Sequence, residues 1–162
     1  MTKIIAITGG IGSGKSTFSK KVIKRGYSLL DSDKEVANIY KNPSRNFLNH
    51  LKKIGLEDSV KKNKINKKHI SEVIFSNKKI KLKLEKYIFK IVRQNRKEFI
   101  RLEKRRGAKI AFLDIPLLLE NNLHNKYDLT VSIISKRNIR YYRVRKTKKI
   151  SKEMFNKILK YQ

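Results

Sequence analysis

The chain of 162 residues has no cysteine, no tryptophan and only two prolines. Without cysteine it can form neither a disulfide framework nor a thiolate metal site, which fits a reducing cytoplasm. No apolar run approaches the ~20 residues that a membrane-spanning helix requires. The first apolar run begins within three residues of Met1, which leaves no room for a signal peptide. We therefore expect a cytoplasmic protein with no membrane partner.

Acidic residues are also scarce, because 13 Asp and Glu stand against 42 Lys and Arg, for a formal net charge of +29. A charge of this size is typical of proteins that bind nucleic acids or anionic membranes. The lysines are scattered from Lys3 to Lys160 among many Ile and Asn residues, as a drift toward A/T-rich codons would leave them. A binding arm would instead concentrate its charge in one block. We interpret the charge as solvated surface that attracts anionic nucleotides, and expect no nucleic-acid partner.

A glycine-rich segment directly follows the apolar run 4–8, and reads Gly9-Gly10-Ile11-Gly12-Ser13-Gly14-Lys15-Ser16. Gly, four residues and Gly-Lys-Ser form a P-loop, whose backbone N–H groups surround phosphate oxygens. We expect Lys15 to reach the β- and γ-phosphates and the Ser16 hydroxyl to bind Mg²⁺. The helix that begins near Ser16 directs its positive end at the same anion. The segment therefore predicts a bound nucleoside triphosphate with magnesium, rather than an ordinary glycine-rich turn.

Strands and helices alternate along the chain, which predicts a three-layer parallel α/β sheet of the P-loop NTPase kind, in a single P-loop domain over 1–162. Ligands of such sheets bind at the carboxyl ends of the strands. Gly9, Asp31, Asp33 and Asp114 all follow predicted strands. We expect buried strands over 4–8, 27–30, 109–113 and 129–134.

Helical patterns fill the rest of the chain. A helix is expected from Ser16 to Arg25 with Phe18, Val22 and Ile23 inward, followed by helices over 34–40 and from the turn at 42–44 to Gly55. The lysine- and asparagine-rich stretch 57–68 is expected to be an exposed loop. From 69 to 106, apolar residues recur every three or four positions, which predicts one or two long amphipathic helices. We expect 43–106 to be a helical substrate-binding insert, although helices that only flank the sheet would give the same pattern.

Three aspartates follow predicted strands at the ligand-binding edge. Asp31 and Asp33 lie two residues apart, so both side chains would face the same way if the strand geometry continued. One could accept the proton of an attacking hydroxyl, while the other binds magnesium through water or holds the acceptor. An Asx-turn or a helix N-cap is the alternative for this pair. Asp114 ends a buried strand as the magnesium-binding acid of P-loop enzymes does, or else caps the turn before Pro116.

Seven cations crowd the segment after the last predicted strand. In P-loop kinases such cations close over the triphosphate and neutralise charge on the transferring group. We expect 137–162 to form a lid that carries them, although any single one could be plain surface in so basic a chain. They are Arg137, Arg140, Arg143, Arg145, Lys146, Lys148 and Lys149.

Together these segments resemble the dephospho-CoA kinase family, whose members catalyse the last step of coenzyme A biosynthesis. The family's P-loop is similar to Thr8 through Thr17, including the paired glycines and the isoleucine. Its Asp-Ala-Asp motif resembles Asp31-Ser32-Asp33, and its Ile-Phe-x-Asn segment resembles Ile74-Phe75-Ser76-Asn77. Its Asp-x-Pro-Leu-Leu-x-Glu signature resembles Asp114-Ile115-Pro116-Leu117-Leu118-Leu119-Glu120. The order and spacing of the motifs agree over essentially the whole chain.

The resemblance implies that ATP phosphorylates the ribose 3′-hydroxyl of dephospho-CoA, a small-molecule substrate. Asp33 is then the general base, Lys15 the phosphate clamp and Arg140 a further catalytic cation. With the P-loop chemistry, the expected magnesium ligands are Ser16 and Asp114. The nucleotide is expected to contact Gly10, Ile11, Gly12, Ser13, Gly14, Lys15, Ser16, Thr17 and Arg143. The acceptor is expected to contact Thr8, Asp31, Asp33, Asp114, Pro116 and Leu117.

The sequence also departs from the family's pattern. The usual His-Pro pair of the helical subdomain is replaced by Phe89-Lys90, and Ala37 stands where a basic residue or histidine is usual. Thr147 occupies about the place of a lid arginine, beside basic residues that could substitute for it. Family members continue past the position of Gln162 through a further strand and helix that help to form the adenine site. We therefore expect a truncated polypeptide or a shortened variant.

Two other functions are compatible with parts of the sequence. Another small-molecule P-loop kinase, acting on a nucleoside monophosphate or on shikimate, shares the loop and the lid but lacks an equivalent of 114–120. A nucleotide-gated nucleic-acid-binding protein would account for the charge of +29. Salt separates these classes, because counterion release makes nucleic-acid affinity fall steeply with salt, whereas kinase activity changes less.

Overall fold

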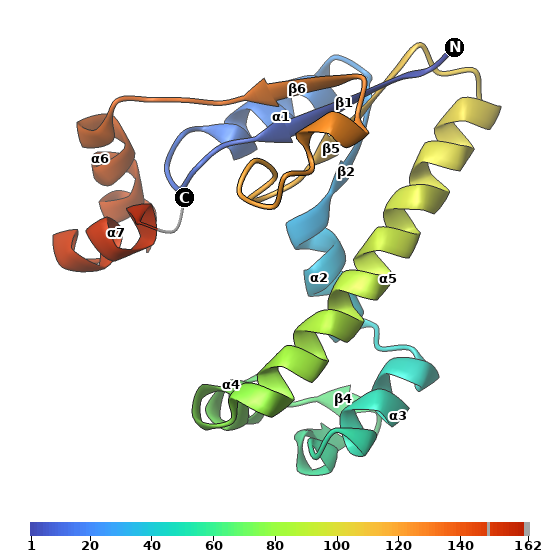
Figure 1. The fold of residues 1–162 in the computed structure, drawn as a ribbon, viewed down its shortest axis with the longest axis vertical. Coiled ribbons are helices and arrows are strands. Elements are labelled where there is room, and N and C mark those ends of the chain that lie inside the picture. The colour runs from blue at the N-terminus through green and yellow to red at the C-terminus, as the bar shows by residue number, and fades with distance from the viewer. Residues whose placement is uncertain (149, 161–162) are drawn as a thin grey trace. The chain divides into compact units, whose positions relative to one another are not determined.

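The computed structural model describes residues 1–148 and 150–160, drawn in Figure 1. The chain divides into two compact units, of which the first joins Met1–Ser32 to Glu98–Gln162 and the second comprises Asp33–Lys97. The second unit begins and ends earlier in the sequence than the insert expected over 43–106. That this unit binds substrate stays a prediction.

The first unit is built on a four-stranded sheet in which every pairing is parallel. Its strands are β1 (Lys3–Thr8), β2 (Ser28–Asp31), β5 (Ile110–Asp114) and β6 (Leu129–Ser132), in the order β2-β5-β1-β6. The register sets Ile7 and Asp31 beside Asp114 on the two strands that flank β5. The carboxyl ends of the strands therefore share one edge, and the predicted P-loop α/β fold class is confirmed.

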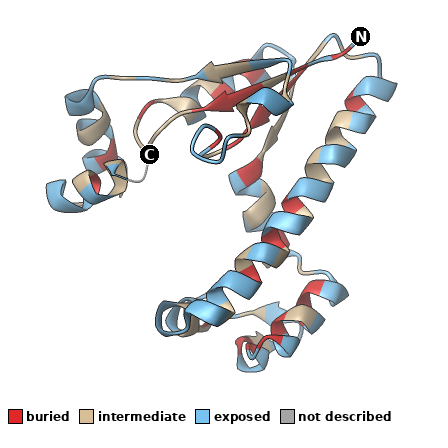
Figure 2. Ribbon diagram, viewed as in Figure 1, coloured by how far each residue is buried: buried red, intermediate tan, exposed pale blue. Residues whose placement is uncertain are grey.

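The two faces of this sheet bury different side chains, because neighbouring residues of a strand point to opposite faces. One face packs against Phe99 and Ile100 of helix α5 (Lys78–Arg105), and the other packs against Phe18 and Val22 of helix α1 (Lys15–Lys24). Figure 2 shows the buried residues of the sheet on its two central strands, β1 and β5. Ile23, which we expected to point inward, is 48% exposed, because α1 covers the sheet with the stripe that passes through residues 18 and 22.

The 3₁₀ turn η2 (His124–Lys126) precedes β6, and two helices follow β6. They are α6 (Arg137–Lys148) and α7 (Lys152–Leu159), which pack together through the rings of Tyr141 and Phe155 at 5.4 Å. The hydroxyl of Ser151 caps α7 by accepting a hydrogen bond from the backbone N–H of Met154. Of the cations expected in a lid, Lys149 lies outside the described residues, as do the side chain of Lys148 and the last two residues of the chain.

The second unit is mainly helical. Its elements are α2 (Ser32–Lys41), α3 (Arg45–Lys53), the 3₁₀ turn η1 (Glu57–Ser59), β3 (Val60–Lys61), β4 (Lys64–Ile65), α4 (Lys67–Ser76) and most of α5. Serine and asparagine fix two helix starts, because the side chain of Ser44 caps α3 and that of Asn66 caps α4. The core of the unit is formed by Ile39, Phe47, Leu51, Ile54, Leu56, Ile70, Leu84, Ile88 and Val92.

The stretch 57–68 is not the plain exposed loop that we expected. β3 and β4 form an antiparallel hairpin in which Val60 pairs with Ile65. The two residues of its turn, Lys62 and Asn63, have φ angles of 47° and 60°. Two consecutive positive φ angles are typical of a type I′ turn, whose twist matches that of a hairpin. The buried Ser59 hydroxyl, 2.7 Å from Nδ1 of His69, anchors the segment to α4.

Helix α5 has 28 residues and confirms the amphipathic pattern predicted for 69–106, together with α4. Its buried residues Leu84, Ile88 and Val92 recur every four positions and face the core of the second unit. Lysine and arginine occupy 12 of its 28 positions. In the described part of the chain, no helix has both the length and the apolar character needed to cross a membrane.

We expect Phe47→Ala to destabilise the second unit by about 3–5 kcal/mol, because Phe47 is fully buried between the rings of Tyr40 and Tyr87. Chemical denaturation with far-UV circular dichroism measures the change. Phe75→Ala is the matched control, because Phe75 is 95% exposed in the same unit. Equal stability of the two variants would contradict the packing described here.

Candidate active site

The loop between β1 and α1 has the backbone conformation that a phosphate site needs. Gly12 has a φ of 72°, and Gly14, which precedes the first turn of α1, has a φ of 103°. Residues with a Cβ rarely adopt such angles. The backbone N–H of Ser13 donates to the carbonyl of Gly10 at 3.1 Å and closes a tight turn within the loop. The first N–H groups of α1 have no intrahelical carbonyl to bond, and such groups bind anions.

Two glycines of the loop also lie against other parts of the chain. A Cβ on Gly9 would lie 2.6 Å from the carbonyl oxygen of Ile133, just after β6. A Cβ on Gly12 would lie 2.5 Å from the carbonyl oxygen of Arg140 and 2.8 Å from a methyl carbon of Val144, both on α6. The backbone of the loop is therefore packed between the end of β6 and α6, where no side chain fits.

A buried carboxylate faces the loop from the end of β5. Asp114 is only 2% exposed, and its Oδ1 forms an ion pair and hydrogen bond with Nζ of Lys15. Its Oδ2 accepts a hydrogen bond of 2.7 Å from the hydroxyl of Ser19. A turn cap before Pro116, our alternative for Asp114, would not account for its contacts with Lys15 and Ser19. Ser19 was not among the site residues predicted from the sequence, although its position four residues after Lys15 puts both on one face of α1.

Asp31 and Asp33 do not share a strand. β2 ends at Asp31, and α2 begins at Ser32, so Asp33 lies in the first turn of a helix. The expectation that both side chains face the same way by strand geometry is therefore wrong. Asp31 lies in register with Asp114 on the neighbouring strand, which brings two carboxylates to one edge of the sheet. Asp33 is exposed and lies inside the first turn of α2. It is therefore not the N-cap of α2, because an N-cap residue precedes the helix.

The residues present suit magnesium only in part. Ser16 and Thr17 are exposed in the first turn of α1, where a hydroxyl can reach a cation bound beside a phosphate. Among the described residues, no group of three or more His, Asp or Glu side chains could hold a metal ion. Magnesium commonly binds through one or two carboxylates together with substrate phosphates and water. Ser16 and Asp114 therefore fit an ion that arrives with the nucleotide.

Arg140, predicted as a catalytic cation, and Arg143, predicted to contact the nucleotide, both lie on α6 and form hydrogen bonds with the loop. Nε of Arg140 donates to the carbonyl of Ile11 at 2.8 Å. Nη1 of Arg143 lies 3.3 Å from the carbonyl oxygen of Gly12 and 3.1 Å from that of Ser13. Both cations thus stand at the phosphate loop, whereas the contact of either with a phosphate stays a prediction.

The remaining residues predicted for the acceptor lie at the ends of β1 and β5. Thr8, the last residue of β1, is 3% exposed. Pro116 and Leu117 lie just after β5. Ile115 lies between β5 and Pro116, and its backbone N–H donates to the carbonyl of Ile7 at 2.9 Å. Leu117 has a φ of 52° and is 39% exposed, which is unusual for a leucine. Its side chain therefore lies within reach of a ligand.

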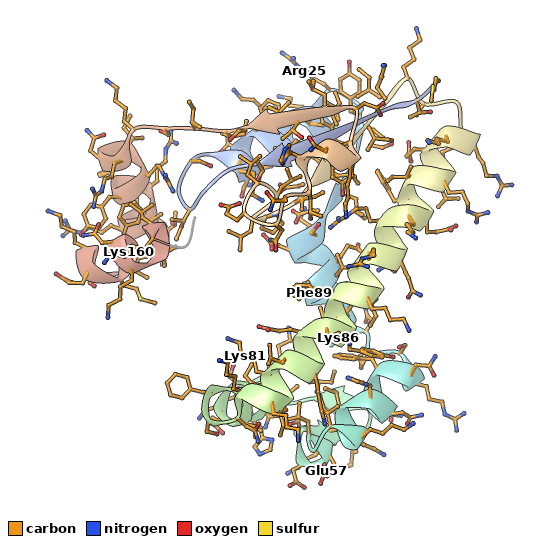
Figure 3. The ribbon with its side chains drawn as sticks, in the orientation of Figure 1. Arg25, Glu57, Lys81, Lys86, Phe89 and Lys160 are labelled. Carbon is orange, nitrogen blue, oxygen red and sulfur yellow. The ribbon has the colours of Figure 1, made fainter. Side chains whose placement is uncertain are left out.

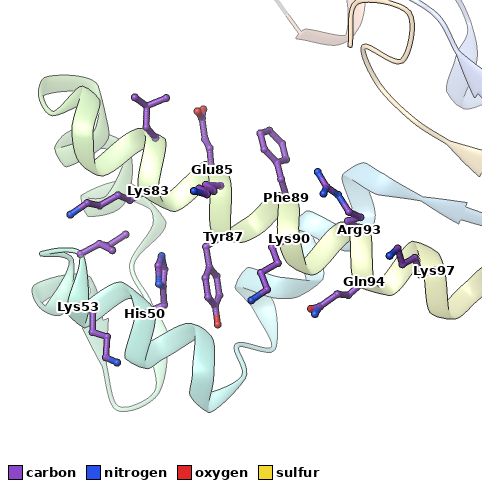
Figure 4. A pocket seen from close by; sticks show the side chains of 13 residues that line it. His50, Lys53, Lys83, Glu85, Tyr87, Phe89, Lys90, Arg93, Gln94 and Lys97 are labelled. Carbon is purple, nitrogen blue, oxygen red and sulfur yellow. The ribbon is translucent and has the colours of Figure 1, made fainter. Parts of the chain in front are cut away.

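The second unit contains a groove of about 920 Å³ between α3 and α5, shown in Figure 4. Six Lys and Arg side chains and one acid, Glu85, line it together with apolar and aromatic residues. The rings of His50 and Tyr87 stack at a centroid distance of 3.8 Å. Burial lowers the pKa of His50, and the charges of Lys53 and Lys83 lower it further, whereas a hydrogen bond with the Lys83 backbone raises it by less. His50 therefore presents an uncharged ring to the groove at neutral pH.

Comparison with known proteins gives consistent matches. The family model described as dephospho-CoA kinase matches residues 3–162. A dephospho-CoA kinase of Fusobacterium nucleatum is 32% identical over 159 residues, which cover 98% of this chain and 80% of the relative. The crystal structure of TT1252 from Thermus thermophilus superposes with a TM-score of 0.79 at 28% identity, covering 99% of this chain and 80% of that one. Dephospho-CoA kinase from Campylobacter jejuni, at 24% identity and a TM-score of 0.72, shares the fold over 100% of this chain and 81% of its own.

We expect Lys15→Ala to lower kcat/KM for ATP by ~10²–10³, because the ammonium group is the charged partner of the phosphates in the loop. Turnover assays with a coupled ADP readout measure the loss. Lys20→Ala, which removes an exposed lysine from the same helix, serves as the control. Near-normal turnover of Lys15→Ala, with its fold verified by circular dichroism, would contradict the assignment of the loop.

Proposed function

The chain belongs to the dephospho-CoA kinase family, whose members use ATP to phosphorylate dephospho-CoA in the last step of coenzyme A biosynthesis, and we propose how its residues divide that work. The observation that carries the proposal is the pairing of Lys15 with the buried Asp114 beside a phosphate-binding loop. The paired lysine is already at the loop, so it needs only to exchange a carboxylate for a phosphate.

The P-loop would hold the triphosphate of ATP. Its backbone N–H groups and the positive end of α1 would bind phosphate oxygens, and Lys15 would bridge the β- and γ-phosphates. Arg140 and Arg143 of α6 both donate hydrogen bonds to carbonyl oxygens of the loop. The charge of Arg143 would favour the negative phosphates, whereas the role of Arg140 at the transferring phosphoryl group stays a prediction.

Magnesium would be held by the hydroxyl of Ser16 and the carboxylate of Asp114, together with phosphate oxygens. When bound, the ion supplies charge neutralisation between the phosphates. Ser19 would keep its hydrogen bond of 2.7 Å to Oδ2 of Asp114 and so fix the orientation of the carboxylate after Lys15 has moved to the phosphates. The hydrogen bond from Ser19 would thus be present in both states, while magnesium would replace the charge of Lys15 beside Asp114.

Asp33 would act as the general base. The oxygen of the ribose 3′-hydroxyl forms a bond to the γ-phosphorus, the bond from that phosphorus to the β–γ bridging oxygen breaks, and ADP leaves with the electron pair. The hydroxyl proton passes to the carboxylate of Asp33. Asp31, in register with Asp114, would hold the acceptor or a water of the magnesium shell. Thr8, Pro116 and Leu117 would line the acceptor site at the same edge of the sheet.

The lining of the groove in the second unit would suit a ligand that carries a pyrophosphate and a pantetheine arm, as dephospho-CoA does. Its six cations complement a pyrophosphate, while Leu82, Tyr87 and Phe89 offer apolar surface to an extended arm. Phe89 is 63% exposed, and Figure 4 shows it projecting from α5. An exposed phenylalanine among lysines suits a ligand that is itself part apolar and part anionic.

We expect dephospho-CoA to be phosphorylated efficiently and adenosine monophosphate to be a much poorer acceptor. The pantetheine arm is missing from the latter, and its remote binding energy is what orients the reacting hydroxyl. The measurement is ADP formation with ATP, Mg²⁺ and a panel of acceptors. Equal use of both acceptors would favour another small-molecule kinase instead.

We expect Asp33→Asn to lower kcat by ~10²–10⁴ with ATP affinity little changed, because the variant keeps the shape of the side chain and loses the base. Asp31→Asn is the matched comparison, and should raise the magnesium requirement or lower stability without abolishing turnover at saturating metal. Turnover and ATP binding of both variants are measured across a magnesium series. A chemical defect confined to Asp31→Asn would show that the base is the other carboxylate.

A further inference from the structure

Helix α6 forms hydrogen bonds with the carbonyl oxygens of the phosphate loop. Arg140 and Arg143 together donate to the carbonyls of three consecutive residues, Ile11, Gly12 and Ser13. The helix also touches the loop by its own backbone, because Gly12 lies so close to the carbonyl of Arg140 that a Cβ there would be 2.5 Å away. Val144, 2% exposed, closes the contact.

These contacts determine where the loop's N–H groups point. In a planar trans peptide, the carbonyl of one residue and the N–H of the next point in opposite directions. A carbonyl of Ile11 directed at Arg140 therefore turns the N–H of Gly12 away from α6. A carbonyl of Ser13 directed at Arg143 does the same for the N–H of Gly14.

The N–H between these two has a different task, because that of Ser13 closes the internal turn with the carbonyl of Gly10. Within the described residues, the N–H groups of Gly12 and Gly14 have no protein acceptor. They are thus donors that α6 turns outward from itself and that the loop leaves for a ligand.

We propose that Arg140 is a positioning residue that sets the phosphate-binding conformation of the loop through the carbonyl of Ile11, rather than by touching a phosphate. The inference builds on the proposed nucleotide site but is independent of the acceptor. Its consequence is that the hydrogen bond of Arg140 matters for every ligand whose phosphate sits in the loop, including ADP and inorganic pyrophosphate. A cation that touched only the transferring group would matter for ATP turnover alone.

Two variants of Arg140 separate the hydrogen bond from the charge. In Arg140→Gln the side-chain amide nitrogen occupies the same place along the side chain as Nε of arginine, so the donor remains and the charge is lost. In Arg140→Met neither donor nor charge remains. We expect ADP and ATP affinities, measured by calorimetry, to fall together by about tenfold in Arg140→Met and to stay within about twofold of the wild type in Arg140→Gln.

The alternatives give different patterns. Equal losses in both variants would mean that the charge matters and would overturn the proposal, as would unchanged ADP affinity in both. Arg25→Gln, which removes an exposed arginine from the end of α1 (Figure 3), controls for the general loss of charge and should leave ADP affinity unchanged. If the chain binds ADP as expected yet does not phosphorylate dephospho-CoA, the proposed function fails while this inference stands.

A measurement on the wild-type protein tests the same point without a variant. On titration with inorganic pyrophosphate, the backbone amide resonances of Gly12 and Gly14 should shift downfield more than that of Ser13, whose N–H is already bonded within the loop. Amide shifts confined to Lys15 and the residues after it would overturn the orientation inferred here. This readout also remains informative if Arg140→Met does not fold.

Discussion

The ion pair between Lys15 and the buried carboxylate of Asp114 is the interaction on which the rest of the site depends. A carboxylate that is 2% exposed is very costly unless it is paired and hydrogen-bonded, and here Lys15 and Ser19 provide both. The pair also joins the three parts that make the site, since it connects the end of β5 to the start of α1 and so to the loop. A nucleotide that takes Lys15 away must therefore supply a replacement charge for Asp114, and magnesium is suited to that role.

Much of the sheet and of the phosphate loop could be predicted, because short sequence patterns determine their local conformation. The P-loop glycines and the apolar runs before Gly9, Asp31 and Asp114 specify local conformation, and parallel strands then bring their carboxyl ends to one edge. The apolar spacing of α5 and the turn at 42–44 before α3 likewise act over a few residues. Family membership followed from motifs in order, whereas the roles of individual side chains stay predictions.

What the sequence did not reveal depends on contacts between distant residues or on turns disguised by composition. Ser19 and Asp114 are 95 positions apart, and Arg140 meets Ile11 across 129 positions. The hairpin at 60–65 was hidden because Lys62, at a positive φ, looks like any other lysine of this chain. Asp33 was misplaced because a helix begins one residue after the strand ends, so the alternation of the strand no longer applies.

The packing around the loop has a further meaning for a chain so rich in Lys, Asn and Ile. Four of its seven glycines fall within positions 9–14, and every glycine codon begins with two guanines. At Gly9 and Gly12, a single methyl group would collide with backbone oxygens at 2.6 and 2.5 Å, so no relaxation of a side chain could accommodate it. Mutational pressure toward adenine and thymine can remodel the surface almost freely, but here it meets a steric boundary at which any amino-acid change would disrupt the loop.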